Sequence, residues 1–399
     1  MPALSYDHLL AACSAGGSSA LTSVTELAPA GGMHTGVAPA RYVDGSRATF
    51  AFETRFIDGE PVKTVIIDQK QSTLNRIEAA VCNAIDDGHP LFDLVPRVQV
   101  SYGDEVYSDL QLPHRVFDGH IRAGTVDGRS VTAHDSYRAA RNATPGNARA
   151  LLEFAPTALV LGAWDASRRT RQGRYRSSLV GEVIGVLADQ TVDQQHLPRR
   201  GGARVDPVAA SVQLKGDDLK SLAEAQREEL SLKLIGKIDK ASSTRGEKEN
   251  SGSVLGLGAI PPSLESLGVV ACRRIIRTHV LSFATLRQLR FGAGPAGDSA
   301  CRTLLAAFAL AGLARSDAEL YLRANCDLIE NDAPAVRMDA RNGNSVDLEP
   351  LTVDETDTLL ATALDEARSE AGIRWEGQVF DVTGNPVVYA TATADTAGE

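Results

Sequence analysis

Two short extended runs followed at once by an amphipathic helix, over residues 49–85, constrain the fold more than any other feature of this sequence. The first run, at 49–56, carries aromatic side chains at the period-two spacing of a strand: Phe50, Phe52 and Phe56. Asp58-Gly59 is typical of a hairpin turn, and the β-branched run at 62–67 predicts the returning strand. Apolar residues spaced three or four apart then predict a helix over 72–85: Leu74, Ile77, Val81 and Ile85.

The rest of the chain continues this mixture of strands and helices. Further strands are expected at 158–164, 207–214, 335–339 and 379–382. Further helices are expected at 177–187, 217–232, 275–289, 298–313, 318–326 and 353–369. Strand-rich pieces interleaved with long helices predict an α+β fold, with helices on one face of a sheet, rather than a doubly wound parallel sheet.

The chain of 399 residues is long enough for two or three minimal domains, or for one domain with long insertions. Residues 1–40 are rich in Ala, Gly, Ser and Thr with weak periodicity, and we expect them to be loosely ordered. We expect residues 41–399 to form a single domain. Its insertions would be a β-arm at 98–135, where short alternating runs are broken by turn signals, a flexible polar loop at 240–253 and an acidic helical part at 317–399.

The charge balance divides the chain. In total, 41 basic and 51 acidic residues give a formal net charge of −10, which by itself argues against a nucleic-acid-binding protein. Residues 317–399 hold 18 Asp and Glu but only five Arg, a net charge of −13. Residues 1–316 therefore carry 36 basic and 33 acidic side chains, so the larger part of the chain can still present a basic surface.

The sequence argues against a membrane protein and favours the cytoplasm. The longest apolar run, Leu304–Ala314, falls short of the ~20 residues that a membrane span needs. The N-terminus shows no secretory signal. The five cysteines are odd in number and widely spaced, which is typical of reduced core thiols rather than of disulfides or a zinc site. We therefore expect a cytoplasmic protein with no membrane partner.

The strongest chemical signal is an arginine-rich loop at 167–176. Half of its residues are arginines: Arg168, Arg169, Arg171, Arg174 and Arg176. Guanidinium groups pair bidentately with phosphate oxygens, and Tyr175 is a candidate for stacking on a base. Like charges this close repel one another unless a polyanion neutralises them, which favours phosphate binding. The alternative is a solvated loop that pairs with the acidic C-terminal region.

A second polar cluster lies at the expected strand-to-helix junction, 68–78. Side chains suited to a phosphate–sugar backbone gather there: Gln71, Ser72, Asn75 and Arg76. Taken alone, these residues favour a hydrophilic helix start with ordinary capping, and nucleic-acid binding is the alternative.

No catalytic or cofactor motif is visible. His114, Asp118 and His120 lie near a turn but lack the further ligands of a metal site. The segment Gly256–Pro262 is rich in glycine, yet it has neither the Lys-Ser/Thr of a phosphate-binding loop nor the dinucleotide fingerprint. The signatures of serine, cysteine and zinc hydrolases are missing too. We expect no cofactor, no metal and no enzyme activity, while an active site assembled from distant residues stays open.

Three blocks of the sequence, in order, resemble a known family. They are Val65–Glu78 (Val-Ile-Ile-Asp-Gln-Lys-Gln-Ser-Thr-Leu-Asn-Arg-Ile-Glu), Thr157–Ser167 with the arginines after it, and Gly256–Pro262 followed by Leu281–Phe291. Together they resemble the backbone subunit of type I-U, also called I-G, Cascade, a CRISPR-associated family of the RAMP superfamily. The resemblance spans roughly residues 40–330. Gln69 and Leu74 depart from the family pattern, which has Ser and Ala there.

The resemblance implies a modified RNA-recognition-motif (ferredoxin-like) core with inserted β-arms, oligomerising along a CRISPR RNA (crRNA). Such a subunit holds the backbone of the guide and leaves its bases free to pair with target DNA in antiviral defence. The implied partners are crRNA, target DNA, other copies of the chain and other Cascade subunits. On this hypothesis the five loop arginines neutralise phosphates, and the junction side chains bond phosphate or ribose: Gln71, Ser72, Asn75 and Arg76.

Two rival functions stay open. Some RAMP proteins process CRISPR RNA or cut target RNA, and one of three histidines would then be the general base: His114, His120 or His134. The other rival is an assembly protein whose arginine-rich loop binds an acidic protein partner.

Overall fold

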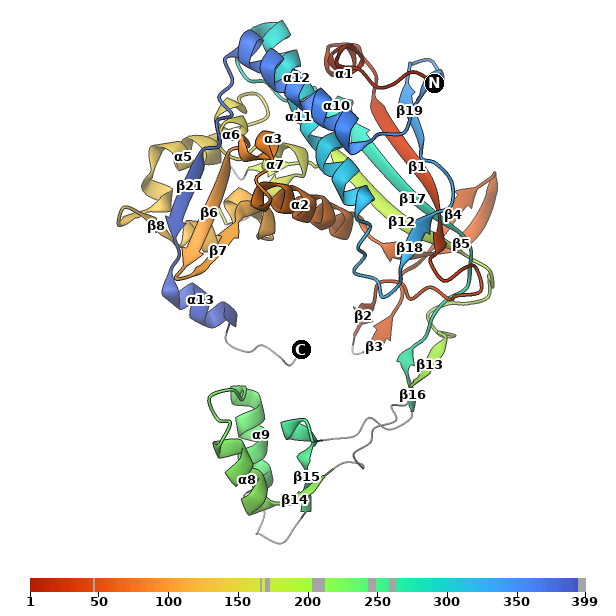
Figure 1. Ribbon diagram of the computed structural model, residues 1–399, viewed down its shortest axis with the longest axis vertical. Helices are drawn as coiled ribbons and strands as arrows, with labels where there is room; N and C mark the ends of the chain where they lie inside the picture. Colours follow the sequence, from red (N-terminus) through yellow and green to blue (C-terminus); the bar gives the residue numbers. More distant parts are fainter. Residues whose placement is uncertain are drawn as a thin grey trace. The chain divides into compact units, whose positions relative to one another are not determined.

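The computed structural model in Figure 1 describes residues 1–45, 47–165, 167–168, 173–202, 212–242, 249–257 and 263–393. The chain divides into two units. Unit 1 comprises Met1–Leu197 and Val269–Asn385, and unit 2 comprises Pro198–Gly268 and Pro386–Glu399. The predicted α+β class is confirmed, because helices accompany sheets whose strands are mostly antiparallel.

A large antiparallel sheet forms the centre of unit 1. Its strands, in spatial order, are β20 (Ser345–Leu348), β19 (Ala335–Asp339), β1 (Ala20–Pro29), β17 (Cys272–Ser282), β12 (Leu179–Leu187), β5 (Glu60–Asp68) and β4 (Phe52–Ile57). A short strand, β18 (Leu328–Glu330), also pairs with β1. The predicted hairpin over 49–67 is confirmed as β4 and β5, and the strand predicted at 335–339 is confirmed as β19.

The order of four of these strands is that of a β-α-β-β-α-β unit. β1, β12, β17 and β19 lie in the order β19-β1-β17-β12. Along the chain, α2 (Lys70–Asp86) falls between β1 and β12, and α11 (Gly294–Ala318) falls between β17 and β19. This is the arrangement of ferredoxin-like folds. The helices predicted over 72–85 and 298–313 are thus confirmed as α2 and part of α11.

The helices of unit 1 pack on one another above this sheet. α11 is buried on nearly all sides, as expected of an alanine-rich core helix, and contacts α2, α1 (Tyr6–Cys13) and α12 (Val353–Ala371). α12 confirms the helix predicted over 353–369. The remaining helices of unit 1 are short: α3 (Pro90–Asp93), α4 (Gly119–Arg122), α5 (Asp135–Asn142), α6 (Arg149–Leu152), α7 (Thr157–Val160) and α10 (Phe283–Leu286), with 3-10 turns η1 (Asp109–Gln111), η2 (Arg115–Phe117) and η3 (Val131–Ala133).

A second sheet of unit 1 joins two distant parts of the chain. Its order is β7 (Glu105–Ser108), β6 (Arg97–Tyr102), β21 (Val379–Thr383), β8 (Thr125–Val126) and β9 (Arg129–Ser130). β21 pairs in parallel with β6, and Phe380 of β21 packs against Tyr137 and Phe154. Residues 98–135 thus contain the short strands expected of a β-arm, and the C-terminal strand β21 joins them in one sheet of unit 1. The strand predicted at 379–382 is confirmed.

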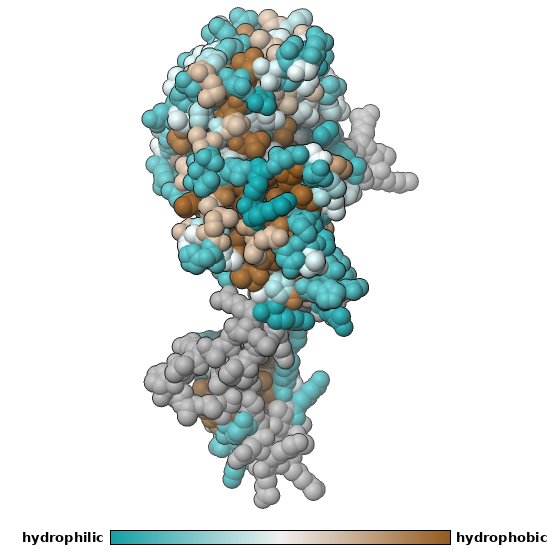
Figure 2. Space-filling model, turned by 90° about the vertical axis from the view of Figure 1, so that its right-hand side faces the viewer, coloured by the Kyte–Doolittle hydropathy of each residue, from teal (hydrophilic) through white to brown (hydrophobic). Residues whose placement is uncertain are grey.

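Two strand pairs lie outside both sheets of unit 1. They are β2 (Tyr42–Asp44) with β3 (Arg47–Thr49), and β10 (Ala163–Trp164) with β11 (Arg174–Tyr175). The surface of unit 1 presented in Figure 2 is mixed, with brown hydrophobic patches between teal hydrophilic ones. None of the helices that the structure describes has an apolar stretch sufficient to cross a lipid bilayer.

Unit 2 has a small core of its own. Along the chain, most of it is an insertion between β12 and β17. It contains β13 (Arg199–Gly202) paired with β16 (Ser263–Leu267), β14 (Gln213–Lys215) paired with β15 (Glu249–Ser251), and α8 (Gly216–Glu224), α9 (Leu232–Ser242), η4 (Gly252–Leu255) and α13 (Pro386–Thr393). Leu219, Ala223 and Ile238 form the centre of this core.

Several expectations about secondary structure are wrong, and the side chains explain why. The helix predicted at 177–187 is β12, a strand whose run of apolar residues carries no readable period because most of its side chains are buried. The helix predicted at 275–289 is mainly β17, followed by α10. Arg277 and His279 occupy its core face and hide the alternation of a strand.

Residues 1–40 are not the loosely ordered segment expected, because they contain α1 and β1, a strand inside the large sheet. Ser23 and Thr25 lie on the buried face of β1, so its alternation does not show as hydrophobicity. The strand expected at 158–164 is instead a helical turn, α7, followed by the short strand β10. Of the helix expected at 318–326, only Ala318 is helical, as the last residue of α11.

In unit 2, residues 217–232, predicted as one helix, are α8, a turn and the start of α9. The strand expected at 207–214 appears as β14, and its residues 207–211 lie outside the described residues. Of the polar loop expected at 240–253, residues 243–248 also lie outside them. The neighbouring residues belong to α9, β15 and η4.

Candidate nucleic-acid interface

The junction between β5 and α2 is organised around a buried carboxylate. Asp68, the last residue of β5, is almost inaccessible and accepts a hydrogen bond from the Thr73 hydroxyl (3.1 Å). It also accepts from Nε (3.1 Å) and Nη2 (2.9 Å) of Arg76. Nη1 of Arg76 donates to Ser316 of α11 (3.3 Å). The Arg76 guanidinium is therefore neutralised inside the protein, and its expected contact with an RNA phosphate is not supported.

Two of the other three predicted residues at this junction reach the surface. Ser72 is buried, and its hydroxyl has no hydrogen-bond partner within the described part of the chain. Gln71 and Asn75 are exposed on the first turns of α2. In the orientation that satisfies its neighbours, the Asn75 amide donates to Glu78 Oε2 (3.2 Å) and to the Gln71 carbonyl (3.2 Å).

Sequence reasoning missed a group of polar residues beside this junction. The Tyr42 hydroxyl in β2 donates to Gln69, the residue before α2, at 3.3 Å. This contact brings the β2–β3 strand pair next to the start of α2. The exposed basic side chains of this region are Arg41, Arg47 and Lys70. They lie at positions far apart in the sequence, and only the folded chain brings them to the same junction.

The second junction lies at the β10–β11 pair, from which the arginine-rich loop extends. Trp164 stands opposite Arg174 in the pair, and the Arg174 guanidinium lies over the indole ring, 4.8 Å from its centre. This is a cation–π geometry. Trp164 is 43% exposed, and both Arg174 and Arg176 are exposed. Cations and an aromatic ring are therefore displayed together on this surface.

Tyr175 does not lie where a base could stack on it. Its side chain is buried between β10 and the core and stacks on Phe117, with 6.5 Å between ring centres. Its hydroxyl has no hydrogen-bond partner in the described chain, and burial raises the pKa of Tyr175 to about 12. Alternate residues of a strand point to opposite faces, so Arg174 and Arg176 point outward and Tyr175 points inward. The expected RNA contact of Tyr175 is thus not supported.

The described start of the arginine-rich loop is held by an internal ion pair. Asp165 is buried and accepts from Arg141 Nε of α5 (2.6 Å) and from the Ser167 hydroxyl (3.0 Å). Burial opposes ionisation of Asp165, but the bonds and charge of Arg141 outweigh it and hold the pKa of this carboxyl below its usual value. Arg168 donates to the Arg141 carbonyl (3.0 Å) and to Asn142 Oδ1 (2.7 Å). Arg169 and Arg171 lie outside the described residues.

A cleft of about 410 Å³ lies beside the exposed arginines. Arg174 and Arg176 line one part of it, together with Tyr175. The other part comprises the end of β17, α10 and the residues just after it, which contribute three polar side chains: Ser282, Thr285 and Gln288. The remaining lining is apolar: Pro145, Leu159, Ala284 and Leu289. The Ser282 hydroxyl accepts from the Thr285 amide (3.2 Å) and so caps α10. Leu281–Phe291, singled out in the sequence, therefore meets the arginine-rich segment in one cleft.

Arg115 connects the two junctions. Its Nε bonds Glu78 Oε1 of α2 (2.5 Å), and its Nη1 donates to the Gly162 carbonyl (2.7 Å), one residue before β10. Gly162 has a φ of +84°, and an added Cβ would lie 2.9 Å from the Ser177 nitrogen, so this turn requires glycine. Burial raises the pKa of Glu78 to about 7 although Arg115 acts in the opposite direction. Gln71 and Asn75 are not among the residues that line the cleft.

The histidines considered as general bases take part in separate contacts. His120 Nδ1 lies 2.8 Å from the Tyr102 hydroxyl, and His134 Nε2 lies 3.0 Å from the Val126 carbonyl. The His114 amide donates to Asp118 (3.1 Å), whose other oxygen caps α4. Within the described ranges, no group of three His, Cys, Asp or Glu side chains is arranged to hold a metal ion.

Residues 21–190 match the family model described as CRISPR-associated protein GSU0053 (Cas_GSU0053). The matched stretch begins in β1, ends just after β12, and includes both junctions and Arg115. It is similar to a CRISPR-associated protein family, and the match supports a role in CRISPR defence. No curated protein matches the chain.

Proposed function

We propose that the chain is a crRNA-binding backbone subunit of a type I Cascade complex, of the I-U (I-G) kind within the RAMP superfamily. It oligomerises along the guide RNA in the cytoplasm and presents the bases for pairing with target DNA. Other Cascade subunits are its further partners. The family match supports the CRISPR context of this proposal, and the β-α-β-β-α-β order of the central sheet supports a core of the RNA-recognition-motif kind.

The observation that carries the proposal is the cleft beside β11. Two exposed guanidinium groups, from Arg174 and Arg176, border it, and hydroxyl and amide groups from Ser282, Thr285 and Gln288 stand among apolar lining residues. Arginine pairs with phosphate oxygens, while hydroxyl and amide side chains bond phosphate and sugar. None of these contacts depends on base identity. The chemistry suits a protein that holds a sugar-phosphate chain while its bases do the reading.

Arg174 and Trp164 add a second element. An arginine stacked on an exposed indole offers a flat surface next to the phosphate-binding groups, as in proteins that bind single strands without sequence preference. On this proposal the ribose or a base of the guide packs on Trp164.

The proposal is tested by expressing the full chain alone and measuring the nucleic acid that remains bound after purification at moderate salt. We expect bound RNA of mixed sequence. We also expect the affinities for a crRNA and for unrelated single-stranded RNAs of equal length to agree within a few-fold. Protein that is free of nucleic acid and has no measurable RNA affinity would contradict the proposal.

The rival ribonuclease is separated by incubating the protein with repeat RNA and with target RNA plus divalent metal. The proposal expects intact RNA. Specific cleavage that disappears in His120→Ala, His134→Ala or His114→Ala would instead establish the enzyme.

A further inference from the structure

The cleft beside β11 contains polar groups that phosphate alone does not satisfy. Its two guanidinium groups, from Arg174 and Arg176, donate hydrogen bonds, and phosphate oxygens accept them. The opposite part of the lining carries hydroxyl and amide groups, from Ser282, Thr285 and Gln288. Any acceptor among these groups needs a ligand atom that carries a hydrogen, which a phosphodiester lacks. The acceptors of the cleft therefore indicate what else the bound chain must offer.

Ser282 and Thr285 share their hydrogen bonds in a way that leaves one acceptor. The Ser282 hydroxyl oxygen accepts from the Thr285 amide (3.2 Å) and from the Thr285 hydroxyl (3.0 Å). A hydroxyl group has one proton and two lone pairs. Ser282 has thus used both lone pairs and keeps its proton to donate. Thr285 has used its proton and keeps its oxygen as an acceptor.

Gln288 adds a second acceptor beside Thr285. Its Nε2 donates to the Ala284 carbonyl (3.3 Å), four residues before it. The opposite amide orientation would place two oxygens against each other, so this bond fixes Oε1 as the atom that points away from the carbonyl. No described residue donates to Oε1. Gln288 is exposed, and its main-chain amide donates to the Thr285 carbonyl (3.1 Å), so the two acceptors lie three residues apart on one helical turn.

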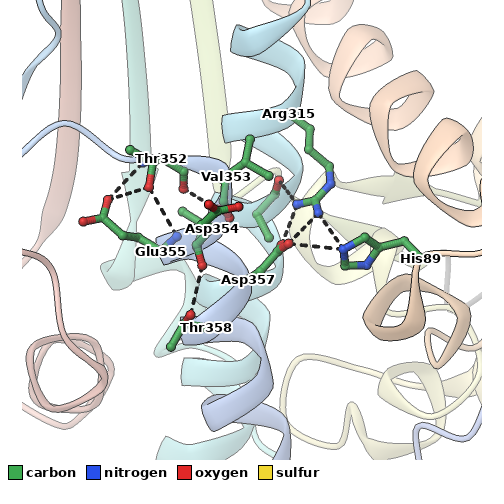
Figure 3. Close-up of polar contacts among 10 residues, drawn as sticks. His89, Arg315, Thr352, Val353, Asp354, Glu355, Asp357 and Thr358 are labelled. Carbon is green, nitrogen blue, oxygen red and sulfur yellow. Dashed lines mark hydrogen bonds and ion pairs between the residues drawn. The ribbon is translucent and has the colours of Figure 1, made fainter.

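A contrasting polar cluster lies at the start of α12, where the chain supplies the donors itself (Figure 3). Both carboxylate oxygens of Asp357 accept from Arg315, at 2.6 and 2.7 Å. The Asp354 carbonyl accepts from the Thr358 hydroxyl (2.9 Å). These acceptors require no ligand, which distinguishes them from the acceptors of the cleft.

The ribose 2′-hydroxyl is the group that matches the acceptors of the cleft. It is the hydrogen-bond donor of the sugar-phosphate chain of RNA, and the corresponding chain of DNA has none. Base edges also carry donors, but the proposed function leaves the bases free to pair with the target. An acceptor that shares a cleft with phosphate-binding guanidinium groups therefore meets a donor on RNA and none on DNA.

We propose that Gln288, with Thr285 beside it, accepts a hydrogen bond from a ribose 2′-hydroxyl, so that the cleft selects RNA over DNA. This inference rests on the proposed function and adds to it the group that distinguishes a guide RNA from a DNA strand of the same sequence. Arg174 and Arg176 bind either kind of strand, since both kinds carry phosphates. The selectivity therefore resides in Gln288 rather than in the charges.

The test compares three single strands that carry only uracil bases: oligouridine, its 2′-deoxy form, and its 2′-fluoro form, which has no hydrogen to donate at this position. The proteins are the full-length wild type, Gln288→Met, which keeps the length of the side chain and loses the amide, and Thr358→Val. Thr358 is the matched control, because it is exposed, bonds the carbonyl four residues before it as Gln288 does, and does not line the cleft. Circular dichroism confirms folding, and fluorescence anisotropy with labelled strands measures each Kd at one salt concentration.

Wild type and control should bind oligouridine about fivefold more tightly than either modified strand, which is the effect of one net hydrogen bond. Gln288→Met should bind oligouridine as weakly as wild type binds the deoxy strand, with its affinity for the deoxy strand unchanged. The inference alone would be overturned by a wild type that binds all three strands equally, by a 2′-fluoro strand that binds as tightly as RNA, or by a Gln288→Met variant that keeps the preference for RNA. A wild type without affinity for any strand would contradict the proposed function, and this inference with it.

Discussion

Replacing Arg115 with Ala removes the link between the two junctions, and the structure sets the size and pH dependence of the effect. The side chains of Arg115 and Glu78 are only 13% and 6% exposed, and their ion pair is 2.5 Å long. The variant also loses the bond to the Gly162 carbonyl. Breaking a buried pair from one side typically costs about 3–5 kcal/mol when the remaining group stays charged. Glu78 can instead take up a proton, so the cost depends on pH.

The pH dependence follows from the raised pKa of Glu78. In the folded wild type this pKa is about 7, above the ordinary value of 4.5, because burial outweighs the lowering effect of Arg115. The carboxyl therefore contributes stability below pH 4.5, and this contribution is lost as the pH rises toward 7. Without Arg115 the pKa of Glu78 in the folded state rises further. Glu78 therefore stays protonated in the variant at pH values at which it is ionised in the wild type.

At about pH 6 Glu78 is protonated in both proteins. We expect the free energy of unfolding of the variant to be about 2 kcal/mol lower, because two hydrogen bonds are lost. Above the wild-type pKa the loss grows by about 1.4 kcal/mol per pH unit, and so reaches roughly 4 kcal/mol near pH 8.5. Urea unfolding, followed by tryptophan fluorescence, measures this difference in the free energy of unfolding. Both tryptophans, Trp164 and Trp375, lie in unit 1, so the signal reports that unit.

The matched control is Arg138→Ala, which removes an arginine that is 59% exposed and 3.6 Å from Asp135. Its effect should stay within about 0.5 kcal/mol at either pH. A loss for Arg115→Ala that is the same at both pH values, or no larger than the control, would refute the assigned link.

Two further substitutions separate internal from RNA-facing groups. Tyr175→Phe removes a buried hydroxyl that has no hydrogen-bond partner among the described residues. We therefore expect the stability of unit 1 to be unchanged or up to about 1 kcal/mol higher, with RNA affinity unaltered. A drop in RNA affinity would show that the hydroxyl contacts RNA. Arg76→Ala leaves Asp68 buried without its ion pair and should cost about 3–5 kcal/mol in urea unfolding. If the folded variant instead kept its stability and lost RNA affinity, Arg76 would be an RNA ligand.

The sequence predicts elements whose side chains follow a simple period and misses those whose core faces are polar. α2 is found from its apolar spacing, and β19 from a short alternating run. β17 is mistaken for a helix because Arg277 and His279 occupy its buried face. These residues are stabilised by partners such as Asp317 on α11, far along the chain, so no local pattern shows which face is inside.

The candidate site likewise contains residues that the sequence identifies and residues whose role only the fold shows. Arg174 and Arg176 stand out in the sequence as part of a charge cluster, and the structure finds them exposed beside a cleft. Arg76 has the same chemical character, but only the fold shows that Asp68 neutralises it. The sequence does not predict that Thr285 lines the cleft, because this position depends on recognising β17 as a strand.

The most direct test measures the affinity of the full chain for single-stranded RNA over a series of salt concentrations. Wild type, the double variant Arg174→Ala with Arg176→Ala, and Arg337→Ala are compared. Arg337 is 59% exposed and pairs with Asp347, outside the cleft, so it is the control.

Losing two phosphate contacts should lower the slope of log K against log salt by about 1.4, since each contact on a single strand contributes ~0.7. The loss of affinity should be nearly equal for unrelated RNA sequences, and Arg337→Ala should match wild type. A double variant that keeps both the affinity and the salt slope of the wild type would show that the cleft beside β11 does not hold an RNA backbone.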